Sequence, residues 1–85
     1  MPSNWRKSGR NGWEHVARMG MRVFFRRNAN KNRPEPYQVF HAHPGRDGGV
    51  VPQAMEYAKS KKAALRKCGI HMRHWNDPRK WRDYW

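Results

Sequence analysis

The stretch from Val16 to Arg27 has the residue types and the spacing of a phosphate-binding surface. Successive side chains of a β-strand point to opposite faces, so residues two apart share a face. One series here is apolar, and the other presents arginines, whose guanidinium contacts phosphate through a planar fork. An ordinary half-solvated strand would show the same alternation, because alternation reports burial. The apolar series is Ala17, Met19, Met21, Val23 and Phe25, and the basic series is Arg18, Arg22, Phe24 and Arg26.

The charge of the whole chain favours the binding interpretation. Among 85 residues there are 19 Lys and Arg against 6 Asp and Glu, which gives a formal net charge of +13. Such an excess attracts polyanions. Arginine outnumbers lysine by 12 to 7, and guanidinium also stacks on base planes, so nucleic acid is the expected partner. The expected surface extends to Arg6, Lys7 and Arg10 in the N-terminal segment, to Arg27, and to Lys31 and Arg33 in the next loop.

Aromatic residues are interleaved with these cations, as in proteins that bind single-stranded nucleic acid. In so small a domain, however, tryptophans are also the main candidates for the core. We expect Trp75 or Trp13 to pack against the sheet or helix, and Trp5 to be free. The aromatic residues with Arg or Lys within a few positions are Trp5, Trp13, Phe24, Trp75, Trp81 and Trp85.

Metal binding and catalysis have little support in the sequence. His41 and His43 share a strand, and Cys68 precedes two further histidines, but one thiol and this spacing match no common zinc pattern. Cys68 and His71 as nucleophile and base would be three residues apart at a helix end, which is proximity and not a site. We therefore expect no enzyme, no catalytic residue, no metal and no cofactor.

Composition also limits the class of protein. A chain of 85 residues with 36% hydrophobic residues forms one small domain with a thin core. The single cysteine excludes an internal disulfide. No apolar run reaches the roughly 18–20 residues of a membrane span, and the N-terminal residues lack the apolar segment of a secretory signal. We expect an intracellular protein, in the cytoplasm, nucleoid or host cytoplasm, with no membrane partner.

Short strands and one helix would position the basic face. Residues 28–36 contain asparagines and two prolines and predict a long hairpin loop. The second strand would span residues 37–43, with either Tyr37 and Val39 or Phe40 and Ala42 facing inward. Val50 and Val51 suggest a short third strand.

The segment from Gln53 to Cys68 has the period of a helix with one apolar side. Pro52 suits the first turn and Gly69 suits the C-terminal cap. The predicted fold is α+β, an antiparallel sheet of two or three strands covered on one face by this helix. The expected domains are a flexible basic arm (1–12), an α+β nucleic-acid-binding domain (13–75) and a short Trp-rich C-terminal helix or tail (76–85).

The run Ser60-Lys61-Lys62-Ala63-Ala64 resembles the start of the last helix in double-stranded-RNA-binding domains, although it lies in the middle of the predicted helix. The resemblance covers five residues. The order of short strands before one helix is also similar to three-stranded DNA-binding modules of the integrase-arm and plant types, which place a sheet in the major groove. Neither likeness assigns the chain to a family.

The function predicted from these observations is non-enzymatic binding of DNA or RNA. The basic and aromatic sheet face would bind, together with the basic arm, mostly through phosphate contacts. The alternative is a small basic protein, for example virus-encoded, that docks on an acidic surface of a polymerase, nuclease or immune complex. Trp and Arg dominate the hot spots of such protein interfaces.

Overall fold

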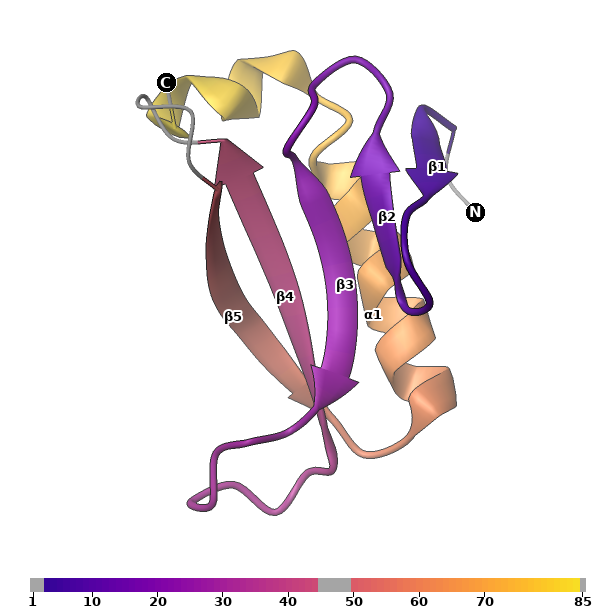
Figure 1. The fold of residues 1–85 in the computed structure, drawn as a ribbon, viewed down its shortest axis with the longest axis vertical. Coiled ribbons are helices and arrows are strands. Elements are labelled where there is room, and N and C mark those ends of the chain that lie inside the picture. The colour runs from indigo at the N-terminus through magenta and orange to yellow at the C-terminus, as the bar shows by residue number, and fades with distance from the viewer. Residues whose placement is uncertain (1–2, 45–49, 85) are drawn as a thin grey trace.

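The chain forms a five-stranded antiparallel sheet with one α-helix packed against one of its faces (Figure 1). The computed structural model describes residues 3–44 and 50–84, without the side chains of 50–55 and 82–84. The α+β class is confirmed, whereas the prediction of two or three strands is wrong. The elements are β1 (Trp5–Lys7), β2 (Gly12–His15), β3 (Arg22–Arg27), β4 (Tyr37–Pro44), β5 (Val50–Ala58), the helix α1 (Lys61–His74) and the 3-10 helix η1 (Pro78–Tyr84).

The alternation predicted for the first basic strand is confirmed over its second half. Met21, Val23 and Phe25 are buried, whereas Arg22 and Phe24 are only partly buried and Arg26 is exposed. The buried series of β3 packs against α1, where it shares a core with Ala64, Cys68 and Met72. The two series therefore lie on opposite faces of the sheet, as expected for a strand.

A tight turn replaces the first half of that predicted strand. Gly20 has a φ of +95°, a conformation that favours glycine. The His15 amide donates to the Met21 carbonyl at 3.0 Å and closes the turn. Ala17 and Met19 therefore point into solvent, and Met19 is 80% exposed, so their predicted burial is wrong. Arg18, predicted on the basic face, is buried instead, with its guanidinium carbon 5.5 Å from the centre of the Trp81 ring.

The N-terminal segment is part of the sheet. β1 pairs with β2, and Trp5 is only 6% exposed. Its indole Nε1 donates to the Met72 carbonyl at 3.1 Å and to Asn76 Oδ1 at 2.8 Å, at the C-terminal end of α1. The expectation that Trp5 is free is therefore wrong. Trp13 and Trp75 are both buried, in agreement with the expectation for at least one of them.

The predicted helix from Gln53 to Cys68 begins eight residues later and ends six residues later in the structure, because β5 occupies residues 50–58 and α1 spans 61–74. Pro52 is tolerated there because β5 is an edge strand. Ser60 is the N-cap, since its hydroxyl accepts from the Ala63 amide at 3.1 Å. The run from Ser60 to Ala64 therefore begins the helix and does not lie in its middle. Gly69 is not the C-cap, because α1 continues past it and ends at Trp75.

The Ser60 cap gives a stability prediction. Replacing Ser60 with alanine leaves an amide at the start of α1 without its acceptor, and should lower the free energy of unfolding by about 1 kcal/mol. Ser60→Asn, which retains a side-chain oxygen, should stay within a few tenths of a kcal/mol of the wild type. Urea denaturation measures both. Equal stability of Ser60→Ala and wild type would show that the cap does not support the helix.

Two buried histidines occupy the core under the C-terminal part of α1. The His41 ring stacks on Trp75, with ring centres 4.2 Å apart, and lies 3.6 Å from the His43 ring. Burial lowers the pKa of His41 to about 3 and that of His43 to about 4. Both side chains are therefore neutral in the folded protein at neutral pH.

Neither helix in the described part of the chain is long and apolar enough to cross a membrane.

Candidate nucleic-acid interface

The sheet face opposite α1 is uncovered by any other described element and contains the strongest candidate site. The register of β3 and β4 places Arg22 opposite Ala42, Phe24 opposite Phe40 and Arg26 opposite Gln38 on this face. We call it the open face. The residues between them along the two strands, such as Val23 and His41, point to the other side of the sheet, toward α1.

Four side chains of β3 and β4 form a continuous row on the open face. The rings of Phe24 and Phe40 are stacked, with centres 5.1 Å apart and planes at 6°. The guanidinium carbon of Arg26 lies 4.4 Å from the centre of the Phe40 ring, and that of Arg22 lies 5.4 Å from the Phe24 ring. Each arginine thus rests on an aromatic ring in a cation–π contact. We call Arg22, Phe24, Phe40 and Arg26 the arginine–phenylalanine row.

The charge of the open face is partly neutralised on the β1–β2 side. Arg6 pairs with Glu14 at 2.8 Å, and this hydrogen bond, with one from the Gly20 amide, lowers the pKa of the Glu14 carboxyl. Arg22 opposes Glu14 across the β2–β3 ladder and donates to the Ser8 carbonyl at 3.2 Å. Arg26 is exposed, and no described carboxylate lies within ion-pair distance of it. The unneutralised positive charge of this face is therefore centred on Arg26.

Three further basic residues of the predicted surface lie away from the open face. Lys7 is on the side of α1, where its Nζ lies 4.3 Å from the Trp13 ring centre and donates to the Arg10 carbonyl. Arg27 shares that side, with its guanidinium carbon 5.8 Å from the Tyr37 ring centre. Arg18 is buried in the β2–β3 turn. Of the predicted set, the structure brings together Arg6, Arg22, Phe24 and Arg26 on the open face, with Arg10 exposed in the β1–β2 turn.

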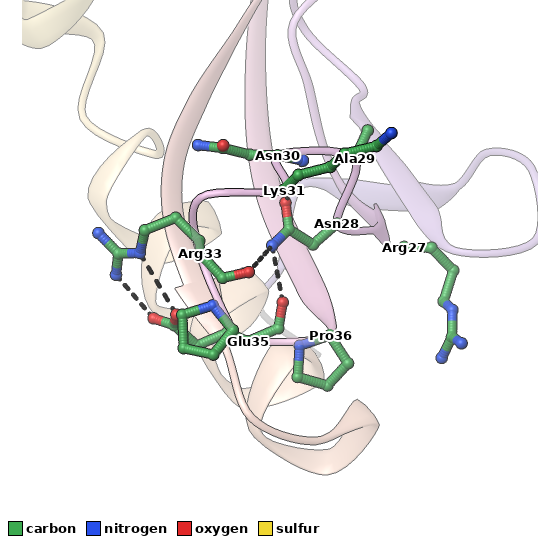
Figure 2. A pocket seen from close by; sticks show the side chains of 9 residues that line it. Arg27, Asn28, Ala29, Asn30, Lys31, Arg33, Glu35 and Pro36 are labelled. Carbon is green, nitrogen blue, oxygen red and sulfur yellow. Dashed lines mark hydrogen bonds and ion pairs between the residues drawn. The ribbon is translucent and has the colours of Figure 1, made fainter.

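The loop between β3 and β4 carries the remaining predicted cations and encloses a pocket of about 380 Å³. Figure 2 shows the Asn28 amide donating to the carbonyls of Arg33 and Glu35, which holds the two sides of the loop together. The Arg33 guanidinium is paired with the Glu35 carboxylate at 2.6 Å, and Arg27 points away from the loop. Among the described residues, the lining cations Lys31 and Arg27 have no ion pair. The loop is a weaker candidate for anion binding than the arginine–phenylalanine row.

Phe40 is the main site residue that sequence reasoning did not assign. The sequence allows either Tyr37 and Val39 or Phe40 and Ala42 to face inward, and the structure places Tyr37 and Val39 on the side of α1. The sequence of β4 does not alternate between polar and apolar residues because β4 is a central strand, and residues 38–43 are buried on both faces. Phe40 is 7% exposed although it faces away from the core, because Phe24 and Arg26 cover it.

Cys68 and the histidines do not assemble into a reactive site. Cys68 is fully buried, and burial raises the pKa of its thiol to about 12, so it is not a thiolate at neutral pH. His71 instead contacts the Glu56 carboxylate at 2.5 Å. Within residues 3–44 and 50–84, no group of three His, Cys, Asp or Glu side chains is arranged to hold a metal ion.

Comparison with known protein families, with curated proteins and with solved structures finds no match to this chain.

Proposed function

We propose that this protein binds nucleic acid through the open face of its sheet, without catalysis, and that phosphate contacts supply most of the affinity. The arginine–phenylalanine row is the observation that carries this proposal. It places two guanidinium groups on one face, four residues apart along β3, which is about 13 Å between their Cα atoms.

The stacked rings support phosphate binding more than base stacking. A base needs an exposed ring face, as in proteins that bind single strands. Phe24 and Phe40 are stacked on each other, and Arg22 and Arg26 lie against them. The rings therefore act as a support that holds the guanidinium groups in position, which reduces the side-chain entropy lost on binding. Arg6, Arg10 and Lys31 would extend the contact beyond the row.

A salt titration tests the proposed mechanism. If about six phosphates are neutralised, the logarithm of the association constant for duplex DNA should fall with the logarithm of the salt concentration at a slope near −5. The same titration on duplex RNA and on single strands would identify the preferred nucleic acid. An affinity that barely changes between low and physiological salt would exclude binding through phosphate contacts.

The second candidate function, docking on an acidic protein, is favoured by one observation. Val16 and Met19 are 58% and 80% exposed in the β2–β3 turn, and apolar side chains gain nothing from phosphate. An apolar pocket on a protein partner would bury them. Purification of the protein from lysate with and without nuclease distinguishes the candidates, because a complex that survives nuclease treatment favours a protein partner.

A further inference from the structure

The outer surface of α1 carries a second set of cations, on the side of the molecule opposite the open face. The helix contains no Asp or Glu. In a helix, residues three or four positions apart lie on the same side. This spacing aligns Lys62, Arg66, Gly69 and Arg73, and the three cations are exposed. We call these four residues the α1 outer stripe.

The charges of the α1 outer stripe are not neutralised within the described chain. Lys67, on the side of the helix that faces the sheet, pairs with Glu56 at 3.1 Å. Lys62, Arg66 and Arg73 have no ion pair with any described carboxylate. Their separation of 11 positions corresponds to about 16 Å along the helix. The stripe thus presents three exposed cations without an ion pair to a described carboxylate.

Gly69 gives an independent indication that the stripe approaches something outside the molecule. Glycine inside a helix costs about 1 kcal/mol relative to alanine. A Cβ at Gly69 would meet nothing within 4 Å, so packing within the protein does not require glycine there. Gly69 is also not the C-cap, because α1 continues to His74. The missing side chain permits close approach of another backbone between Arg66 and Arg73.

We propose that the α1 outer stripe binds a second nucleic-acid segment, so that one molecule bridges two segments held on opposite faces. The bridging rests on the proposed function of the open face. A helix about 10–12 Å wide fits a major groove about 12 Å wide. Leu65 and Ile70, 42% and 52% exposed, flank Gly69 and would contact the apolar parts of the groove, such as thymine methyl groups.

Energy transfer between two labelled duplexes tests the bridging. Duplexes of about 20 base pairs, about 68 Å long, exceed the 34 Å length of the protein. One duplex carries a donor fluorophore and the other carries an acceptor fluorophore. The two duplexes are mixed at equal concentration with the protein. The measurement is made with duplex DNA and with duplex RNA. Wild-type protein should produce transfer that disappears when excess protein saturates each duplex separately.

Charge reversal on α1 should separate bridging from binding. The double variant Arg66→Glu/Arg73→Glu should reduce transfer at least about fivefold, while the dissociation constant for a single duplex rises no more than about threefold. The second effect is small because charges are screened over about 8 Å at physiological salt, and the sheet lies between the stripe and the open face.

Two substitutions at Gly69 provide a matched control for folding. Gly69→Ala places a Cβ in open space and should raise the melting temperature, but that Cβ occupies the space through which the second segment approaches, so transfer should fall below that of the wild type. Gly69→Leu also increases helix propensity but projects beyond the helix surface, so it should reduce transfer about fivefold or more without unfolding the protein.

The outcomes distinguish the two proposals. If wild-type protein binds a single duplex but gives no transfer, or if charge reversal on α1 leaves transfer unchanged, the α1 outer stripe does not bind nucleic acid, and an acidic protein becomes its best occupant. If no duplex is bound at all, the proposed function itself is wrong.

Discussion

Replacing Arg26 with glutamate should weaken duplex binding by roughly 30-fold at physiological salt. Non-specific dissociation constants of about 10⁻⁴ to 10⁻⁶ M, shared among about six phosphates, correspond to about 1 kcal/mol per contact. Changing +1 to −1 removes one contact and adds a repulsion of similar size. Because Arg26 is exposed and only rests on Phe40, the loss of its cation–π contact should cost at most about 1 kcal/mol of stability. Fluorescence anisotropy and thermal denaturation measure the two effects.

Arg27→Glu is the matched control, since it makes the same change in net charge at the next residue. Arg27 lies on the other side of the sheet, against Tyr37, so the affinity of this variant for duplex DNA should differ from that of the wild type by about threefold or less. Equal losses for the two variants would mean that net charge, and not the open face, determines binding. Arg22 is a poorer probe than Arg26, because a carboxylate at Arg22 would oppose Glu14 and lose the bond to the Ser8 carbonyl.

Acidification should destabilise the protein progressively below about pH 6.5, because His41 and His43 are buried as neutral groups. In the unfolded chain both titrate near 6.5, whereas in the folded protein their pKa values are lowered to about 3 and about 4. The unfolded state therefore binds more protons in this window, and stability is complete above pH 6.5 and falls as the pH decreases. Each histidine contributes about 1.4 kcal/mol per pH unit, so the pair removes roughly 4 kcal/mol by pH 5. That is a large part of the 5–15 kcal/mol typical of a small domain.

Urea denaturation at a series of pH values measures this loss, and His41→Phe provides the comparison. Phenylalanine can stack on Trp75 as His41 does, but it does not titrate, so the slope of stability against pH should fall to about half. Carboxylates do not obscure the result. Hydrogen bonds from Arg6 and Arg79 lower the pKa of Glu14 and Asp77, so their contribution is lost only below about pH 4.5. A stability that stays constant from pH 7 to pH 5 would contradict the burial of neutral histidines.

The two-sided strand was predictable from sequence because its period reports burial directly. One face of the strand is apolar, with Met21, Val23 and Phe25, and α1 covers that face. The start of α1 was misplaced because Ala54 and Ala58, four positions apart, fit a strand period of two as well as a helical period. Ser60 was the signal that distinguished them, since a serine three residues before Ala63 caps the helix.

Long-range contacts explain what the sequence did not predict. β1 contains one large apolar residue, Trp5, whose partners Met72 and Asn76 lie 67 and 71 positions away, so no local pattern marks it. One of the four residues of the arginine–phenylalanine row was equally hidden. Arg22, Phe24 and Arg26 follow from the period of β3, but Phe40 joins them only through the β3–β4 register. The cations of α1 resemble an ordinary solvated helix surface until Gly69 is found inside the helix instead of at its end.

The anchoring of Trp5 has a consequence for biosynthesis. Its indole finds an acceptor only once residues 72 and 76 have left the ribosomal tunnel, which encloses the last part of a growing chain. The bonds that tie β1 to the C-terminal end of α1 therefore form only after the whole of α1 has been synthesised.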